Sequence, residues 1–333
     1  MLFSKVEIGI DLGTTNILIY EKSKGIVLDE PAIIVIDTKT DEVIATGSEA
    51  KDMVGKTPEN YVAVRPLTDG IINDYDLTAK LLKSLLKKAV PSVRKPTIVV
   101  NVSTDSTSVE QRAIHNAISS FGASNIHFID EPVAAAIGAN LPIEEPIASV
   151  VVDIGGGTTE VGIISFGGVV ASDSIKIGGN IFDEKIMQFI RENHNVLIGS
   201  QTAEQLKITI GNAYPDHKEQ TEEVVGRDLI TGLPKTVTIS SKDIYEAIED
   251  SLQSISLSIH KTLEAAPPEL SGDIVDHGII LTGGGALLKG MKRWLAEKTK
   301  VPIFIAPDPL HSVALGTGEA LSMISTLKQM KMK

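Results

Sequence analysis

Two short segments place an aspartate, glycines and hydroxyl side chains in nearly the same order. Residues 11–16 read Asp-Leu-Gly-Thr-Thr-Asn and residues 153–160 read Asp-Ile-Gly-Gly-Gly-Thr-Thr-Glu, each after an apolar run. A second apolar stretch follows each segment, at residues 17–20 and 161–166, so each segment predicts a β-hairpin with a Gly/Thr tip. Such a tip can direct backbone N–H groups at one anion. The strand-end aspartate can hold Mg²⁺ through its waters. Two facing hairpins would clamp a nucleoside triphosphate between two halves of the molecule.

A third glycine run supports the same class of ligand. Residues 279–288 read Ile-Ile-Leu-Thr-Gly-Gly-Gly-Ala-Leu-Leu, and residues 291–297 have helical periodicity. A run of glycines lets a flat group such as adenine or ribose lie directly on the backbone. For any one of the three segments a tight structural turn is the simpler explanation. Three in this order, two of them led by aspartate, favour nucleotide binding.

The composition limits the class of protein. The chain has 333 residues, enough for two domains, and 42% of them are hydrophobic. Its net charge of −12 argues against nucleic-acid binding and makes general adsorption to anionic lipid unfavourable. It has no cysteine, which excludes disulfides and thiolate chemistry and fits a cytoplasmic location. It also has no apolar run of transmembrane length and no signal-peptide pattern.

Strands rich in valine and isoleucine alternate with helical stretches along the whole chain. The clearest predicted helices cover residues 77–89, 109–121, 181–193 and 242–263. This alternation predicts an α/β fold with helices covering the sheets. The two aspartate-led segments begin about 140 residues apart, which suggests an internal duplication.

The order of these motifs resembles a known superfamily. The two aspartate-led segments, the Glu-Pro-Val-Ala-Ala-Ala of residues 131–136 and the Leu-Thr-Gly-Gly-Gly-Ala of residues 281–286 resemble actin, heat-shock chaperones and sugar kinases. Within that group the whole chain is similar to the MreB family of bacterial actin-like proteins. Further similar segments are residues 25–31, 64–71, 226–235 and 267–274. The MreBH-type branch is the most similar, with the MreB and Mbl types as alternatives.

The resemblance implies a domain organisation. It predicts an actin-like ATPase fold of two ribonuclease-H-like halves, each with an inserted subdomain. The first core (IA) would comprise residues 1–29, 75–140 and 312–333, with subdomain IB at 30–74. The second core (IIA) would comprise residues 141–176 and 240–311, with subdomain IIB at 177–239.

The resemblance also assigns roles around the phosphates. Asp11 and Asp153 would fix Mg²⁺ on the β- and γ-phosphates, although an aspartate can also simply cap a strand-end turn. The N–H and hydroxyl groups expected to contact the phosphates belong to Thr14, Thr15, Asn16, Gly155, Gly156, Gly157 and Thr158.

Glu131 is the candidate to orient the attacking water. It lies between a predicted strand at residues 126–129 and a small-residue helix at 133–139. The alternative is an exposed carboxylate that is stabilised by the start of a helix. The resemblance favours the catalytic role, with Thr158 assisting. We expect slow hydrolysis that depends on filament assembly.

Two segments would contact ribose and adenine. Glu204 and Lys207 lie three apart on one helix face, and a surface ion pair is the alternative explanation. The resemblance places the segment 204–207 on one side of the nucleotide and the glycine run on the other. The predicted residues are Glu204, Gln205, Leu206 and Lys207, then Gly283, Gly284, Gly285, Ala286 and Leu287.

The chain departs from the family pattern at two places. Residues 103–106 read Ser-Thr-Asp-Ser where many members have Pro-Ser-Gly, and we expect Ser103 or Asp105 to cap the following helix. The connection at residues 90–96 is short, with Val90 and Val93 beside basic residues. It would either touch an anionic bilayer or form a solvated turn. The N-terminal residues 1–5 offer a second membrane contact, and the basic end at 328–333 is expected to be a solvated tail.

Together these features predict a filament-forming, ATP- and Mg²⁺-dependent bacterial actin homologue. By resemblance its subunits would stack head to tail in paired filaments on the inner face of the cell membrane. There they would organise the cell-wall synthesis machinery and rod shape, without binding nucleic acid. The alternative is a soluble small-molecule kinase, which would need a catalytic aspartate beside a sugar or acid pocket. The sequence offers no clear candidate for that residue. A chaperone-type ATPase is a third possibility.

Overall fold

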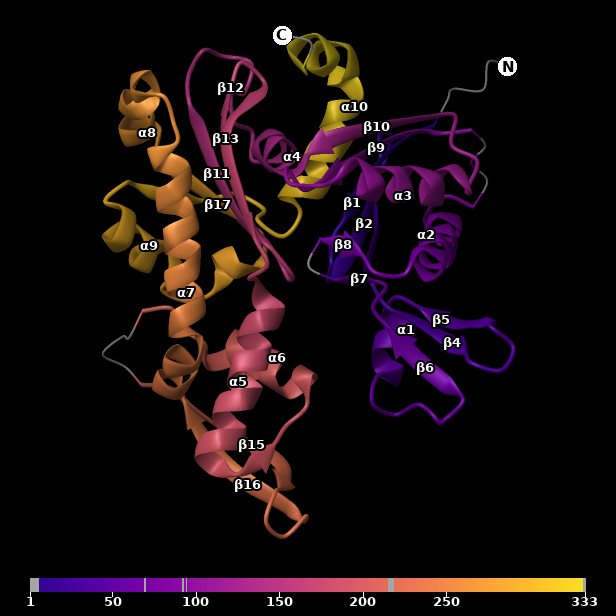
Figure 1. The fold of residues 1–333 in the computed structure, drawn as a ribbon, viewed down its shortest axis with the longest axis vertical. Helices are drawn as coiled ribbons and strands as arrows, with labels where there is room; N and C mark the ends of the chain where they lie inside the picture. The colour runs from indigo at the N-terminus through magenta and orange to yellow at the C-terminus, as the bar shows by residue number, and fades with distance from the viewer. Residues whose placement is uncertain (1–5, 69, 92, 94, 215–218, 332–333) are drawn as a thin grey trace.

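The computed structural model describes residues 6–68, 70–91, 93, 95–214 and 219–331. Two five-stranded mixed sheets form the upper part of the molecule, and two smaller lobes extend below them (Figure 1). The first sheet has the order β10-β9-β1-β2-β3. Its strands are β1 (Glu7–Leu12), β2 (Asn16–Glu21), β3 (Gly25–Pro31), β9 (Thr97–Val102) and β10 (Asn125–Asp130).

The second sheet repeats the topology of the first. Its order is β13-β12-β11-β17-β18, and β11 is antiparallel to β12 but parallel to β17, as β1 is to β2 and β9. Its strands are β11 (Ser149–Ile154), β12 (Thr159–Ser165), β13 (Gly168–Ile175), β17 (Ile279–Thr282) and β18 (Ile303–Ile305). The equal pairing patterns agree with the duplication that the sequence suggests.

Both aspartate-led segments form the predicted hairpins. In the first hairpin Asp11 is paired with Leu18, and in the second Asp153 is paired with Glu160. The strands form because their apolar residues are buried on both faces, most completely in β11 and β12. Each aspartate therefore lies at the end of a rigid buried strand, with the Gly/Thr tip directly beyond it.

The lower lobes are each built around a three-stranded sheet. One contains β4 (Ile34–Asp37), β5 (Val43–Thr46) and β6 (Tyr61–Val64), and the other contains β14 (Val196–Leu197), β15 (Thr221–Asp228) and β16 (Pro234–Ser240). A short hairpin of β7 (Leu67–Thr68) and β8 (Ile71–Ile72) returns the chain toward the first large sheet.

The helices confirm the predicted periodic stretches within about two residues at each end. Their bounds are α1 (Ser48–Met53), α2 (Tyr75–Ala89), α3 (Ser108–Ser119), α4 (Glu131–Gly138), α5 (Gly179–His194), α6 (Ser200–Ile210), α7 (Ser241–Glu264), α8 (Ser271–His277), α9 (Met291–Thr299) and α10 (Ser312–Lys331), with 3₁₀ turns η1 (Pro268–Leu270) and η2 (Gly284–Leu287). Among the described residues, no helix combines the length and apolarity needed to cross a membrane.

The prediction that Ser103 or Asp105 caps α3 is wrong. Thr107 is the N-cap, and it forms a capping box with Glu110 in which each side chain accepts from the other residue's backbone N–H. Thr107 and Glu110 already satisfy the free N–H groups of the first turn, so no upstream cap is needed. The Ser103 hydroxyl has a different partner, Glu160 in the second large sheet.

The apolar side chains of the segment 90–96 face the protein core. Val90 ends α2 with only 3% of its surface exposed, and Val93 packs against the same apolar core. Of the other proposed membrane contacts, residues 1–5, Ser92 and Arg94 lie outside the described residues, as do residues 332 and 333 of the tail.

Helices α4 and α10 form the junction between the halves. The small residues of α4 pack with Val99 of β9 and Val151 of β11, so one apolar cluster joins both large sheets. The two helices cross closely because they meet at glycines. A Cβ on Gly138 would overlap the Ser312 carbonyl, and one on Gly316 would overlap the Ala134 carbonyl. This junction fixes α4, whose first residue is Glu131, between the two hairpins.

Candidate functional site

Four carboxylates from both halves gather behind the hairpin tips. Asp11 and Asp153 are the second-last residues of β1 and β11, Glu131 begins α4 and Glu160 lies in β12. Asp153 is 5% exposed and Glu160 only 1%. Burial of this many acidic groups together is costly unless they are protonated, hydrogen-bonded or neutralised by a cation.

The pKa values reflect that cost. Burial raises the pKa of Asp11 from 3.8 to about 7. Burial, followed by the charges of Asp11 and Glu160, raises the pKa of Asp153 to about 8. Burial also raises the pKa of Glu131 well above 4.5, and the other three carboxylates add to that shift. Each group feels the charge of another, so the four form one electrostatic unit.

The donor set fits Mg²⁺. Two aspartate carboxylates on rigid strand ends are hard oxygen ligands, and this ion usually retains several waters and binds substrate phosphates as well. Within the described ranges, no group of three or more His, Asp or Glu side chains is arranged to enclose a metal ion.

The two hairpin tips touch each other. A Cβ on Gly156 would overlap Thr15 Oγ1, and one on Gly157 would lie 2.8 Å from the Thr14 methyl carbon. Only glycine at these positions allows the tips to approach this closely. The second tip also contacts the start of α5, because Gly155 O accepts a hydrogen bond from Gly179 N at 3.0 Å. Predicted phosphate ligands from the two halves are thus adjacent.

Internal hydrogen bonds hold the side chains of the first tip. Thr14 Oγ1 accepts from the N–H of Gly70 at 2.9 Å, so its own proton stays available for another acceptor. Thr15 Oγ1 donates to Asn180 Oδ1 at 3.4 Å, across to α5. Asn16 Nδ2 donates to Asp29 at 2.7 Å and ties the tip to β3. Asn180 and Gly70 were not identified from the sequence.

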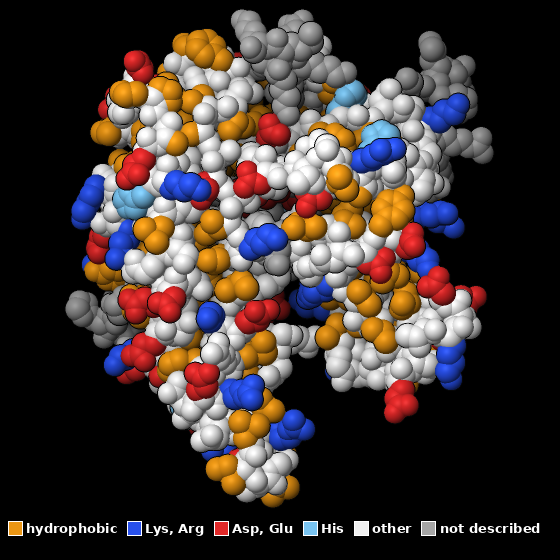
Figure 2. Space-filling model, in the orientation of Figure 1, with side chains coloured by type: hydrophobic (Ala, Val, Ile, Leu, Met, Phe, Trp, Pro, Cys, Tyr) orange, Lys and Arg blue, Asp and Glu red, His pale blue; other side chains and the backbone are white. Residues whose placement is uncertain are grey.

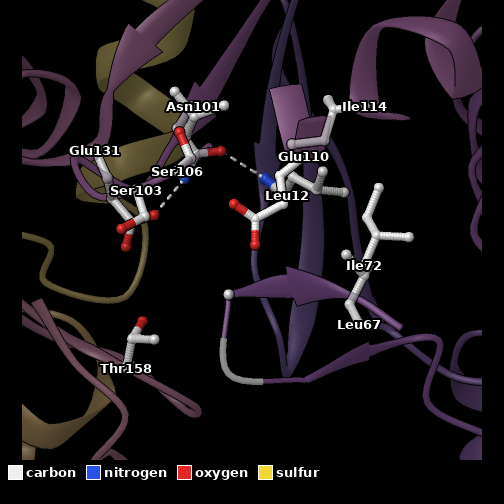
Figure 3. A pocket seen from close by; sticks show the side chains of 12 residues that line it. Leu12, Leu67, Ile72, Asn101, Ser103, Ser106, Glu110, Ile114, Glu131 and Thr158 are labelled. Carbon is white, nitrogen blue, oxygen red and sulfur yellow. Dashed lines mark hydrogen bonds between the residues drawn. The ribbon is translucent and has the colours of Figure 1, made fainter. Parts of the chain in front are cut away.

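A cavity opens beside Glu131 (Figure 3). Glu131, Asn101 and Thr158 line one side, and Leu67, Ile72 and Ile114 contribute apolar surface on the other. The structure therefore brings the two predicted catalytic residues, Glu131 and Thr158, to one hollow. The remaining lining residues are Leu12, Gly70, Val102, Ser103, Ser106 and Glu110.

Asn101 is a site residue that the sequence analysis missed. Its Oδ1 accepts from the N–H of Leu12 at 2.8 Å, and its Nδ2 donates to Glu131 Oε2 at 2.9 Å. Its side chain also lowers the pKa of Asp11 against the effect of burial. The available signal was one amide directly after the apolar run Ile98–Val100 of β9, whose residues are all buried.

Glu160 was also missed as a functional side chain. Its Oε1 accepts from Ser103 Oγ and from Ser174 Oγ, both at 2.7 Å, and Oε2 accepts from Thr104 at 3.3 Å. These hydroxyl donors oppose the rise in its pKa that burial causes. Because Ser103 belongs to the first half and Glu160 to the second, this polar cluster links the halves.

The predicted ribose and adenine contacts divide into two groups. Lys207 lies on the cleft side of α6, with Nζ 2.7 Å from Asp183 Oδ1 and donating to Gly179 O at 2.8 Å. Glu204 is paired at 3.5 Å with Lys51 of the opposite lobe. Leu206, in contrast, is buried in the core, and exposed Gln205 hydrogen-bonds Thr209 on another face of the helix. Of these four residues, Glu204 and Lys207 have partners outside α6.

The hollow between the two lobes has charged walls. Figure 2 shows the surface recessed between the lower lobes, with acidic and basic side chains at its edges. Burial raises the pKa of Asp183 to about 6, and Lys207 opposes that rise. Burial lowers the pKa of Arg65, whereas Glu204 and Asp183 act in the opposite direction. One salt bridge, Lys51–Glu204, and the opposite charges of Arg65 and Asp183 therefore join the two sides of this opening.

Close packing inside the protein requires glycine within residues 283–285. A Cβ on Gly283 would overlap Asp153 Oδ1, and one on Gly285 would overlap the Ile154 side chain. The run thus lets η2 pack directly on the end of β11. Gly284 has more room, Ala286 is buried in the core and Leu287 is half exposed. Through Asp153, this packing connects the predicted adenine side of the site with the phosphate side.

Comparison with known proteins gives matches along nearly the whole chain. The MreB/Mbl protein family matches residues 5–329. The cell shape-determining protein Mbl of Bacillus cereus is 47% identical over 96% of this chain and 97% of its own length. The cell shape-determining protein MreB of Escherichia coli K12 is 46% identical over 96% and 94%. These nearly equal identities leave the MreBH-type assignment a prediction.

Solved structures give the same picture of the fold. MreB5 of Spiroplasma citri, bound to AMPPNP, superposes with a TM-score of 0.93 at 36% identity and covers 98% of both chains. A MamK double helical filament superposes with a TM-score of 0.82 at 19% identity over 96% of this chain and 99% of that one. The actin-like fold that the motif order predicts is confirmed.

Proposed function

The chain belongs to the MreB/Mbl protein family, and we propose that it is an ATP-binding, filament-forming actin homologue. The observation that carries this proposal is the contact of the Gly156–Gly157 tip with the Thr14–Thr15 tip, directly beyond half-buried Asp11 and buried Asp153. The structural relative from Spiroplasma citri is described with AMPPNP and with ADP bound. The division into cores IA and IIA and subdomains IB and IIB, with the boundaries expected from the sequence, is part of the proposal.

The nucleotide would lie in the cleft between the halves. Backbone N–H groups and hydroxyls of the two tips would contact the phosphates, because both tips converge there. Glu204, Lys207 and the backbone at residues 283–287 would border ribose and adenine. Mg²⁺, when bound, would neutralise the phosphates and the aspartates together, which offsets the burial cost of Asp11 and Asp153.

Glu131 would orient the water for hydrolysis. In that step the water oxygen bonds to the γ-phosphorus, the bond to the bridging oxygen of ADP breaks, and the water proton passes to a Glu131 oxygen or the phosphate. Glu131 is well placed because it lines the cavity beside Thr158. A carboxylate acting without a cationic partner should be slow, so we expect weak turnover that increases on assembly.

Assembly and cellular role follow from the family. Subunits would stack head to tail, a contact that propagates into a filament because it does not close on itself. We propose paired filaments on the inner face of the cell membrane that organise wall synthesis and rod shape. The support for the cellular role is that the Bacillus cereus and Escherichia coli relatives are named cell shape-determining proteins.

Two sets of variants test the site. Glu131→Ala should still bind Mg-ATP but release phosphate at least about tenfold more slowly. Asp11→Ala and Asp153→Ala should weaken Mg-ATP binding itself, measured with a fluorescent ATP analogue. Asp250→Ala, an exposed aspartate on α7, is the matched control and should leave both quantities unchanged. Normal phosphate release in Glu131→Ala, or normal affinity in both aspartate variants, would contradict the assignment.

A further inference from the structure

Asn101 is an amide side chain at a buried position, where its polar groups need hydrogen-bond partners. It is the second-last residue of β9, whose residues are all buried, and it is 3% exposed. Burying an amide costs free energy unless both its donor and its acceptor are satisfied. Here both are satisfied, and the two partners belong to different elements of the site.

The hydrogen bonds fix which way the amide points. The backbone N–H of Leu12 can only donate, so the atom facing it must be Oδ1 of Asn101. The other end of the amide must therefore offer its N–H to Glu131 Oε2, at 2.9 Å (Figure 3). Leu12 directly follows Asp11, so this one side chain connects the strand end carrying an aspartate with the first residue of α4.

The remaining oxygen of Glu131 is left for other ligands. Among the described residues, Oε1 has no protein hydrogen-bond donor, and Glu131 lines the cavity. The bond to Oε2 restricts rotation of the carboxylate, and Glu131 lines the same hollow as Thr158. Leucine, aspartate or alanine at position 101 would lack the N–H that this arrangement needs.

We propose that Asn101 is a positioning residue, which holds the Glu131 carboxylate in the orientation that water activation requires. This inference rests on the proposed hydrolytic function. A general base that can rotate freely spends little time within reach of the attacking water, and misplacement by about 1 Å can cost about 100-fold in rate. Loss of the Asn101 amide should therefore slow chemistry while leaving nucleotide contacts in place.

The test combines single and double variants. Asn101→Leu keeps nearly the same size, adds no charge to the carboxylate cluster and lacks the donor to Glu131, and Asn101→Ala removes the side chain beyond Cβ. We expect about 10- to 100-fold slower phosphate release per polymerised subunit in each, with ATP-analogue affinity within about threefold of the unchanged protein. Thr97→Val, a buried polar substitution in the same strand, is the matched control and should not change the rate.

The double variant separates positioning from a merely structural role. If Asn101 acts through Glu131, Asn101→Ala should cause no further loss in a Glu131→Gln background. An equal loss in both backgrounds, or a normal rate in Asn101→Leu and Asn101→Ala while Glu131→Gln is slow, would overturn this inference and leave the proposed function intact. A normal rate in Glu131→Gln itself would instead overturn the role of Glu131, and with it that of Asn101.

Discussion

The buried carboxylates predict that the nucleotide-free protein loses stability as pH rises. The pKa of Asp153 is about 8 in the folded protein, compared with 3.8 for an ordinary aspartate, the value taken for the unfolded chain. The folded form therefore holds its proton over a pH range in which the unfolded form has released it. The stabilising effect of that proton is complete below pH 4 and is lost as pH approaches 8. Asp11, with a pKa of about 7, acts in the same direction.

The perturbation that isolates this effect is Asp153→Asn, which keeps the shape and removes the charge. A shift from 3.8 to about 8 corresponds to on the order of 5 kcal/mol at alkaline pH. Relaxation of the protein and solvent around the site is expected to offset about half of this free-energy cost. The variant should then be more stable than the unchanged protein by about 2 kcal/mol or more at pH 8. Near pH 5 the two proteins should differ far less.

The assay is thermal unfolding in EDTA without nucleotide, at pH 5, 6.5 and 8. A gain of about 2 kcal/mol should raise the unfolding temperature by several degrees. Asp250→Asn is the matched control and should follow the unchanged protein at every pH. Added Mg-ATP should stabilise the unchanged protein more than Asp153→Asn, because the variant binds it more weakly. An unfolding temperature of Asp153→Asn at pH 8 equal to or below that of the unchanged protein would refute the electrostatic account.

Two further substitutions test the junction between the halves. Gly156→Ala should weaken ATP binding at least about tenfold, because its Cβ would overlap Thr15 and force the tips apart. Gly272→Ala is the control and should bind ATP normally, because a Cβ there meets open space. Ser103→Ala should lower the free energy of unfolding by about 1–2 kcal/mol in urea, because buried Glu160 loses a donor at 2.7 Å. Unchanged ATP affinity in Gly156→Ala, or unchanged stability in Ser103→Ala, would contradict the described contacts.

The sequence predicts local features of this protein best. Each hairpin, with its aspartate and glycines, is contained in one short segment, so its strands and tip can be read directly. The partners of Asn101 and Ser103 are side chains 30 and 57 residues away, and the folded topology alone brings them together. Their polar character in a buried strand and a turn was visible, but their partners were not.

Two local features of the sequence were interpreted incompletely. Val90 was considered as part of an exposed basic segment, although as the residue that ends α2 it is buried in the core. The cap of α3 was assigned to Ser103 or Asp105, although Thr107 and Glu110 have the spacing of a capping box. The first error came from tertiary packing that no local pattern reveals, and the second from a local signal that was overlooked.

The measurement that tests the central claim most directly is electron microscopy of the purified protein with Mg-ATP, with and without anionic lipid, beside Asp153→Ala. We predict filaments of the unchanged protein on lipid with Mg-ATP, and none of the variant at the same concentration. Filaments that are equally abundant without lipid would contradict the membrane part of the proposal. No filaments in either condition over a wide concentration range, or filaments of Asp153→Ala as abundant as those of the unchanged protein, would contradict nucleotide-driven assembly.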